Sequence, residues 1–371
     1  MAIEHLLELD DIMMIPSPTN SGLRKNINLF VNDLGDATTL NPQSLPLFTS
    51  PMNGIIDENN CKIWADQGVK PIIPRTVPLE IRKQTVTSVW TAFSVAEVEN
   101  LWLMKDQRSV QAQFHVCIDC GNGHDIEMIK MAAKLKQGYQ GQMQIMAGNI
   151  GNPEGYQHYC RAGIDYVRVG ISSGSLVDEN HFGFHYPMAS LLMEITKSRK
   201  LLASQGTPIT KVIADGGIQR HSDILKAISL GADYVMCGRE FIQLLEASGT
   251  IYKKLKDPST GKEFYDEIME KDYASISPTK LSSQRLFRTF CGNTSLEIQA
   301  IRAGFGDYST WRKSKPNEKP KGGDSGWEWV KVTSTLDQWV REFKEVAMYG
   351  MMMSGADSWD KFRQENRYVA I

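Results

Sequence analysis

The chain has 371 residues, of which 42% are hydrophobic and 23% charged, and its formal net charge is -2 at pH 7. A nearly neutral chain gives no reason to expect nucleic acid or an anionic membrane as a partner, so a ligand phosphate would need local groups to hold it. No apolar run approaches the roughly 20 residues that span a bilayer, and the first residues lack the basic-then-apolar pattern of a signal peptide.

Eight short apolar runs alternate with helix-like stretches, which is typical of a parallel sheet built from strand–helix units. The expected strands are 47–50, 69–73, 89–95, 114–118, 144–147, 167–170, 212–214 and 234–237. Helices are expected at 124–136, 153–162 and 221–230, where Pro153 suits a first helical turn and Gly163 and Gly231 suit the ends.

An internal repeat of the form G-x-D-Y-V-x-x-G occurs at residues 163–170 and again at 231–238. Repeated strand–helix units together with eight expected strands favour a closed α/β barrel, the (β/α)8 or TIM barrel. An open, doubly wound sheet is the alternative.

The pattern changes after Gly238. Residues 248–333 are polar and contain clusters of Gly, Pro and Lys, which predicts a long excursion or flap and not a second packed domain. Because the excursion follows the last strand, it belongs to the carboxyl end of the barrel, where loops build active sites. Residues 334–371 are predicted to form a C-terminal amphipathic helix, at 335–353, and a tail. We therefore expect a single domain over residues 1–371.

The six cysteines are scattered and are typical of reduced thiols, so we expect a cytoplasmic protein. Cys117 and Cys120 form a C-x-x-C pair in a buried strand. No second pair or histidine cluster completes a zinc site, so core packing is the favoured interpretation and no metal site is predicted.

Glycine-bearing turns follow the last three expected strands, at 170–175, 214–217 and 237–239. Barrels commonly hold a phosphate near the loops after strands seven and eight, where glycine lets the backbone approach the oxygens. The hydroxyl of Ser175 and the guanidinium of Arg239 would add donors. Asp215 would either accept hydrogen bonds from a ribose diol or cap the helix near Arg220, and the sequence leaves both open.

The order and spacing of several segments resemble the IMP dehydrogenase/GMP reductase family. These segments are 10–12, 50–52, 146–150, 161–175, 213–218, 231–238, 354–356 and 362–371. The resemblance covers nearly the whole chain and includes no segment like the regulatory CBS pair. Residues 118–124 are closer to the GMP reductase version.

The resemblance implies a purine nucleoside monophosphate as ligand, a nicotinamide cofactor, NADP(H) or NAD, and a homotetramer. The implied phosphate, ribose and purine contacts are Gly174, Ser175, Gly217, Gly238, Asp215, Ser50 and Met52. Residues 290–295, with Gly292 and Asn293, resemble the segment whose backbone grips the base. Asp119 and Asn149 would face the cofactor.

The chain departs from the family at its nucleophile. The family's loop after strand six reads G-x-G-S-x-C-T-T-R, and its cysteine thiolate attacks the purine C2 carbon to form a covalent adduct. Here Val177 occupies the cysteine position, and Asp178 and Glu179 replace the threonines. Lys315 stands where GMP reductases carry a glutamate on the late flap. A valine cannot be a nucleophile, so any reaction must run differently.

New polar residues appear instead in the altered loop: Asp178, Glu179, His181 and His185. Carboxylate and imidazole suit general acid–base catalysis, or in principle a metal, and we take the first three as candidate catalytic residues. The alternative is a solvated loop that has drifted. Arg239 replaces a small residue at the phosphate turn and would either bind a phosphate or fill space.

Two functions follow from these residues. The first, which we favour, is an oxidoreductase-like enzyme that acts on a purine nucleotide without the usual thioimidate, or with a relocated cysteine such as Cys120 or Cys291. The second is a non-catalytic purine-nucleotide-binding protein that serves as a sensor or an assembly partner.

Overall fold

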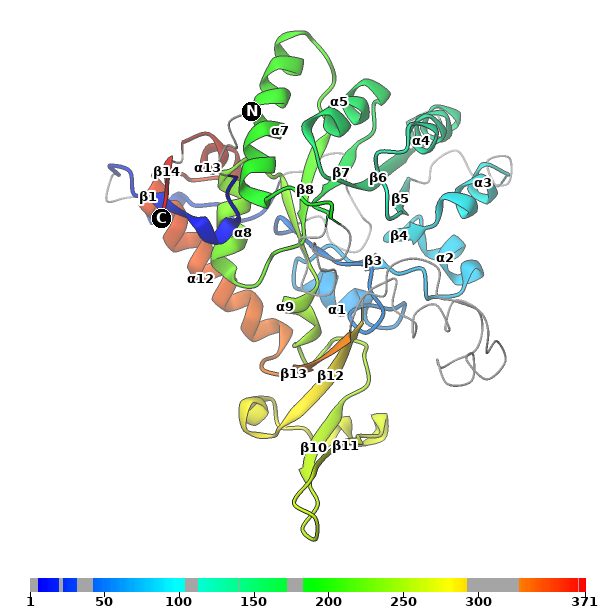
Figure 1. Ribbon diagram of the computed structural model, residues 1–371, viewed down its shortest axis with the longest axis vertical. Helices are drawn as coiled ribbons and strands as arrows, with labels where there is room; N and C mark the ends of the chain where they lie inside the picture. The colour runs from blue at the N-terminus through cyan, green and yellow to red at the C-terminus, as the bar shows by residue number, and fades with distance from the viewer. Residues whose placement is uncertain are drawn as a thin grey trace.

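Eight parallel strands form the centre of the computed structural model, which describes residues 6–19, 23–31, 43–103, 113–139, 141–171, 183–291, 327–365 and 367–371 (Figure 1). The strands are β2 (Leu47–Thr49), β3 (Ile72–Ile73), β4 (Trp90–Phe93), β5 (Phe114–Asp119), β6 (Met143–Ile150), β7 (Tyr166–Val169), β8 (Lys211–Asp215) and β9 (Tyr234–Cys237). Their order in the sheet is β2-β9-β8-β7-β6-β5-β4-β3.

The two edges of this sheet meet just before β3. Phe48 forms a parallel bridge with Lys70. The amide of Thr49 donates to the Lys70 carbonyl (3.0 Å), and the amide of Lys70 donates to the Leu47 carbonyl (2.9 Å). The sheet therefore closes on itself, which confirms the predicted (β/α)8 barrel and removes the open-sheet alternative.

Helices connect successive strands and lie outside the barrel (Figure 1). They are α1 (Cys61–Asp66), α2 (Leu79–Thr85), α3 (Val95–Leu103), α4 (Ile126–Gly138), α5 (Pro153–Ala162), α7 (Met188–Ser204), α8 (His221–Ser229) and α9 (Arg239–Ile242). Local sequence sets the limits of α5: the Asn152 side chain accepts from the Gly155 amide, Pro153 occupies the first position, and Gly163 ends the helix in the left-handed region at φ 69°.

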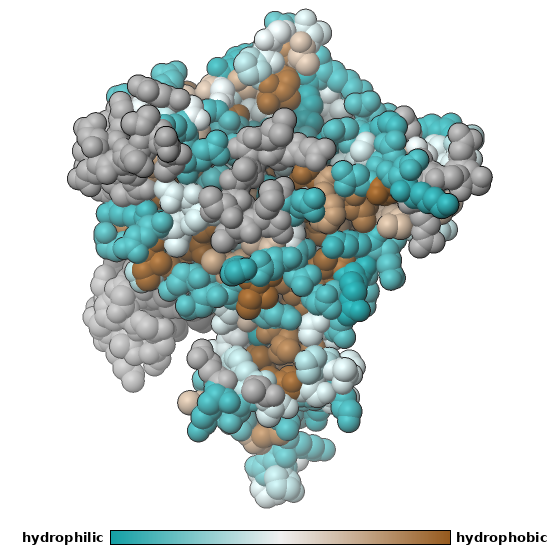
Figure 2. Space-filling view, turned by 180° about the vertical axis from the view of Figure 1, so that it is seen from behind, coloured by the Kyte–Doolittle hydropathy of each residue, from teal (hydrophilic) through white to brown (hydrophobic). Residues whose placement is uncertain are grey.

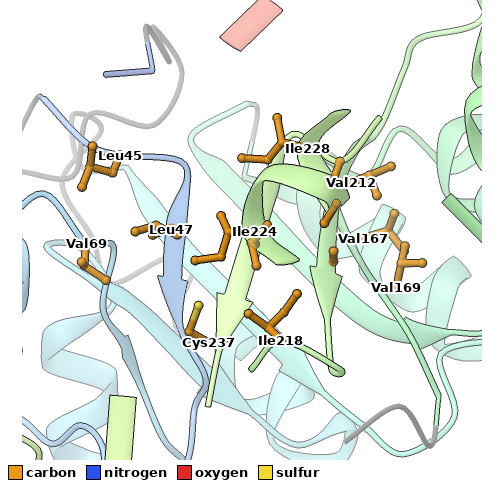
Figure 3. Packing of buried hydrophobic residues seen from close by; sticks show 14 of the residues in the cluster. Leu45, Leu47, Val69, Val167, Val169, Val212, Ile218, Ile224, Ile228 and Cys237 are labelled. Atoms are coloured by element: carbon orange, nitrogen blue, oxygen red, sulfur yellow. The ribbon is translucent and has the colours of Figure 1, made fainter. Parts of the chain in front are cut away.

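Side chains alternate between the barrel interior and the surrounding helices. The interior holds Phe48, Trp90, Tyr166 and Tyr234, whose rings contact one another mostly edge to face. The intervening residues point outward into a larger apolar layer, and in Figure 3 Leu47, Val212 and Cys237 of the strands lie beside Ile224 and Ile228 of α8. This period of two decides which side chains reach the interior at the strand ends.

The excursion after β9 contains an antiparallel sheet that projects from the barrel (Figure 1). Its strands, in the order β11-β10-β12-β13, are β10 (Tyr252–Lys256), β11 (Glu263–Glu267), β12 (Leu286–Cys291) and β13 (Trp327–Lys331). The 3-10 helices η4 (Glu270–Ser275) and η5 (Pro278–Ser283) precede β12. A small apolar cluster lies here, made of Ile251, Ile276, Leu281, Leu286 and Val332. The described part of the excursion thus contains a sheet with its own apolar cluster, which the polar composition did not predict.

One arginine fastens this sheet to the barrel. Arg288 of β12 is fully buried and donates to the backbone carbonyls of Gly249 (2.7 Å), Leu245 (2.9 Å), Leu244 (2.5 Å) and Ile242 (3.4 Å). Burial lowers the pKa of Arg288 to about 10, so it remains charged at neutral pH. Apolar residues gather at the neck between the barrel and the excursion sheet, whereas most of the same face is polar (Figure 2).

The two ends of the chain pair with each other. β1 (Ile12–Ile15), which follows η1 (Leu9–Asp11), is antiparallel to β14 (Arg367–Ala370). The short η2 (Leu23–Asn26) lies near the start, and α12 (Leu336–Ser354) and α13 (Trp359–Glu365) precede β14. Thr335 caps α12 and Gly355 ends it, which confirms the predicted C-terminal helix. None of the helices in the described ranges is long and apolar enough to cross a membrane.

Candidate functional site

Three charged side chains form the last interior layer at the carboxyl end of the barrel. Cys117, Tyr166 and Ile213 lie in the interior cluster, on β5, β7 and β8. Because side chains alternate along a strand, the residues two positions later, Asp119, Arg168 and Asp215, also face the interior. The two aspartates are predicted from the sequence, whereas Arg168 is not.

Arg168 joins the two aspartates. Its Nη1 donates to Asp119 Oδ1 (2.7 Å), and its Nε donates to Asp215 Oδ2 (3.0 Å). Arg168 is only 6% exposed, and burial by itself would disfavour its charge, but Asp215 and Asp119 outweigh that effect and raise the pKa of Arg168. The result is a permanently charged clamp across β5, β7 and β8.

Asn149 completes this arrangement from β6. Its Nδ2 donates to Asp215 Oδ2 (2.8 Å) and to the Gly170 carbonyl (2.9 Å). One oxygen of Asp215 therefore receives both Arg168 and Asn149, whereas no residue of the described ranges donates to Oδ1. That oxygen is the one suited to accept from a sugar hydroxyl.

The hydrogen bonds around α8 bear on the second interpretation of Asp215, as a helix cap. α8 begins at His221, and the amides of Gln219 and Arg220 donate to Asp223 Oδ2 (3.1 and 3.0 Å). Asp223, buried in the helix's own first turn, thus binds the two amides that precede α8. Asp215 Oδ2 receives Arg168 and Asn149, and no α8 amide of the described ranges donates to Asp215, so the contacts do not support the capping alternative.

The backbone of the β8 turn requires glycine. Gly216 and Gly217 have φ values of 114° and 72°, a region that other residues rarely adopt. Gly170, at φ 129°, is also constrained by packing, since a Cβ there would lie 2.4 Å from the Asp215 carbonyl oxygen. These glycines hold the ends of β7 and β8 close together.

Gly238 differs from these glycines. Its φ is -109°, outside the left-handed region, and an added Cβ would find ordinary contact distances to Met52 Sδ (3.5 Å), Phe290 Cζ (3.6 Å) and Ser50 Cβ (3.6 Å). Neither the backbone nor the packing demands glycine at this turn. The same distances bring together Ser50, Met52 and Gly238, which the sequence analysis assigned to one site.

Arg239 follows this turn and is paired with a carboxylate. Its Nε and Nη2 donate to the two carboxylate oxygens of Glu328, at 2.9 and 3.2 Å. Glu328 belongs to β13, 89 residues further along the chain, so no local pattern could have found the pair. The predicted phosphate contact of Arg239 stays a prediction.

Asp119, predicted to face a cofactor, is held by two arginines. Besides Arg168, Arg75 donates through Nη1 to the Asp119 carbonyl (2.6 Å), and its Nε lies 3.8 Å from Asp119 Oδ2. Arg75 was missed as well. Both arginines could have been found from the sequence. Arg75 is a charged residue just after an apolar strand, and Arg168 is a charge inside the apolar run 166–169.

The thiols near the site are poorly suited to replace the missing nucleophile. Cys120 Sγ donates to the Gly148 carbonyl (3.1 Å), and burial together with the Asp119 charge raises the pKa of Cys120. Burial raises the pKa of Cys117 to about 12. Since the thiolate is the reactive form, both cysteines are weak nucleophiles at neutral pH. No group of three His, Cys, Asp or Glu suited to a metal occurs among the residues of the described ranges.

Several predicted residues lie outside the described ranges: Gly174, Ser175, Val177, Asp178, Glu179, His181, Gly292, Asn293 and Lys315. His185 is described, and it contacts the N-terminal segment. Its Nε2 lies 2.6 Å from Glu8 Oε1 and its Nδ1 lies 3.1 Å from the Ile171 carbonyl. This histidine therefore links the end of β7 to Glu8.

Comparisons with known proteins agree with this architecture. The family model described as "IMP dehydrogenase / GMP reductase domain" matches residues 7–262. GMP reductases from Oceanobacillus iheyensis and Shouchella clausii are each 28% identical over 278 residues, which cover 72% of this chain and 80% and 79% of those proteins. An inosine-5'-monophosphate dehydrogenase from Chlorobaculum parvum is 36% identical over 135 residues, 36% of this chain and 26% of that protein. Because the family model matches more than half of this chain, the chain belongs to the IMP dehydrogenase/GMP reductase family.

Proposed function

We propose that the protein binds a purine nucleoside monophosphate at the carboxyl end of its barrel. The phosphate meets the backbone of the Gly217 and Gly238 turns, with Gly174, Ser175 and Arg239 as further contacts. The ribose donates to Asp215 Oδ1. The purine lies beside Ser50 and Met52, with Gly292 and Asn293 on its edge.

This proposal rests on the presence of glycine at position 238, where the protein's own structure does not require it. Its backbone has no need of glycine, and a methyl group there would meet its neighbours at ordinary distances of 3.5 Å and more. A ligand that lies against the backbone would explain the glycine, because any side chain at this position would block its approach. A phosphate after the last barrel strand is such a ligand.

We further propose that the protein is an enzyme that modifies the purine base by a route without a cysteine thioimidate. Val177 replaces the nucleophile, and the neighbouring thiols of Cys117 and Cys120 have raised pKa values. Asp178, Glu179 and His181 are the candidate acid–base residues.

The polar groups at the barrel mouth suit a nicotinamide cofactor, NADP(H) or NAD. Asp119 and Asn149 would hold it, because their carboxylate and amide oxygens can accept hydrogen bonds from the NH2 group of a carboxamide. When bound, such a cofactor supplies or accepts a hydride at the base. Arg168 holds Asp119 and Asp215 in place through its hydrogen bonds, so the sugar and the cofactor meet pre-oriented acceptors.

The alternative is a purine-nucleotide-binding protein without catalytic activity, which serves as a sensor or an assembly partner. It is favoured by the loss of the nucleophile and by the internal neutralisation of Arg168 by Asp119 and Asp215. Such a protein would keep the phosphate turn and the ribose aspartate and would lack chemistry on the base.

The first experiment measures GMP and IMP binding by calorimetry for the wild type, Gly238→Ala and Gly121→Ala. Gly121 is the matched control, since an added Cβ there has nothing within 4 Å. A methyl group between backbone and phosphate costs on the order of 1–3 kcal/mol, so Gly238→Ala should weaken binding about fivefold or more. Both variants should unfold at the wild-type temperature.

If Gly238→Ala binds GMP and IMP as tightly as the wild type does, the phosphate does not lie against the Gly238 turn, and this part of the proposal is wrong. The enzyme and its alternative are then separated by following reduced nicotinamide with GMP, and oxidised nicotinamide with IMP, in the wild-type protein. Turnover in either direction supports the enzyme. Tight binding without turnover of either cofactor supports the non-catalytic protein.

A further inference from the structure

The ion pair between Arg239 and Glu328 lies next to the Gly238 turn. Arg239 directly follows Gly238, and Glu328 lies opposite Phe290 in the register of β12 and β13. Side chains of opposed residues share one face of a sheet. Phe290 Cζ lies 3.6 Å from the Cβ position of Gly238, so this face of the excursion sheet meets the turn.

The pair is accessible to solvent. The Arg239 side chain is 41% exposed and the Glu328 side chain 34% exposed. An ion pair that water reaches contributes little to stability, and its partners can be exchanged at low cost. By contrast, Arg288 and Phe290 of the same sheet are buried, and Arg288 donates to four backbone carbonyls. The sheet is therefore docked without help from the exposed pair.

A phosphate monoester offers Arg239 a stronger partner than Glu328 does. It carries about -1.5 to -2 charges at pH 7 and three acceptor oxygens, whereas a carboxylate carries one charge. The guanidinium contacts Glu328 through two nitrogens, and the same fork matches two phosphate oxygens.

We propose that Arg239 exchanges Glu328 for the phosphate of the ligand, so that Glu328 acts as an internal competitor and the two residues together set the preference for a phosphorylated nucleotide over its nucleoside. The inference rests on the proposed nucleotide site. Arg239 gains a dianion only when the ligand is phosphorylated.

The sign of one substitution separates this exchange from a merely structural ion pair. If Glu328 competes with phosphate, removal of its charge strengthens binding. If the pair only holds β13 in place, removal weakens binding or leaves it unchanged. The variants are Glu328→Gln, Arg239→Gln and, as control, Glu263→Gln. The Glu263 carboxylate belongs to β11 of the same sheet and pairs with Lys254 and Arg285.

Dissociation constants for GMP and guanosine are measured by calorimetry for the four proteins. Glu328→Gln should bind GMP up to about fivefold more tightly, the change that corresponds to ~1 kcal/mol for an exposed pair. Arg239→Gln should bind GMP about tenfold or more weakly, since a charged hydrogen-bonded contact is lost. Guanosine affinity should be the same in all four, and Glu263→Gln should match the wild type throughout.

Equal or weaker GMP binding by Glu328→Gln overturns the exchange. If the wild type binds no purine nucleotide, the proposed function fails, and inorganic phosphate tests the exchange by itself. A ligand that binds the native state stabilises it, so millimolar phosphate should raise the unfolding temperature. The increase should be largest for Glu328→Gln, smaller for the wild type and smallest for Arg239→Gln. Equal shifts in the three proteins would overturn the inference.

Discussion

At the residue scale, Arg168 illustrates how a single charge organises the mouth of the barrel. It lies in a strand whose other residues are apolar or aromatic, and it is buried with both of its carboxylate partners nearby. Replacing a buried ion pair as a whole by apolar groups is often tolerated, but removing one partner leaves the other charge buried without compensation. The clamp is therefore sensitive to the loss of its centre.

Arg168→Met should lower the free energy of unfolding by about 3–5 kcal/mol, because Asp119 and Asp215 lose their shared cation. Urea denaturation followed by fluorescence measures this change. The double variant Arg168→Met/Asp119→Asn is the control, and it should lose less than the sum of the two single variants since the residues interact directly. If the double variant loses as much stability as the two single variants together, Arg168 and Asp119 do not interact as described.

At the element scale, the contact between α8 and α12 depends on a histidine at the start of α8. The His221 ring lies 4.6 Å from the Trp339 ring and 6.0 Å from the Phe343 ring, both on α12. Burial lowers the pKa of His221 below its ordinary value of 6.5, and Glu342 opposes this effect more weakly. The folded protein therefore favours the neutral ring.

The unfolding temperature should thus fall as the pH drops through about 6.5 toward the lower pKa of the folded state. Because the unfolded chain binds the proton more readily, the stability tied to neutral His221 is complete above pH 6.5 and is lost below it. Thermal unfolding at pH 7 and pH 5 measures the decrease. His221→Phe keeps an aromatic ring between the helices and should show a smaller decrease than the wild type, and an identical decrease would assign the effect to other groups.

At the scale of the whole molecule, the pairing of β1 with β14 gathers both chain ends into an exposed ribbon. Met13 and Val369 are opposed in the register, and they are 51% and 49% exposed. Ile15 and Ile371 are also exposed. A two-stranded sheet is marginally stable by itself, and exposed apolar groups of this kind favour association. This ribbon is where we expect copies of the chain to meet in the predicted tetramer.

Val369→Asp should therefore reduce the mass of the assembly, since a charge on each copy would be buried against an apolar partner. Size-exclusion chromatography with light scattering gives that mass. Phe264→Asp, which changes a 46% exposed apolar residue on the excursion hairpin, is the control and should keep the wild-type mass. A monomeric wild type, or an unchanged mass for Val369→Asp, would exclude the ribbon as the contact.

The sequence by itself determined the features that depend on neighbouring residues. The short apolar runs that alternate with helix-like stretches predicted the barrel strands, and Pro153 and Gly163 predicted the limits of α5. The glycines after β8 predicted a turn, for which the structure shows positive φ, and Val177 excluded the family's nucleophile without any structure. The composition of the excursion predicted its place after the last strand but not the sheet within it, which is docked through the buried Arg288.

Only the tertiary structure decided which charged groups meet. Arg168 reaches Asp119 and Asp215 because three strands align at one end of the barrel. Arg239 reaches Glu328 because β13 returns to the turn from which the excursion departs. Such pairs depend on barrel closure and strand register, which no local pattern encodes, whereas strand period and turn geometry arise from steric limits within a few residues.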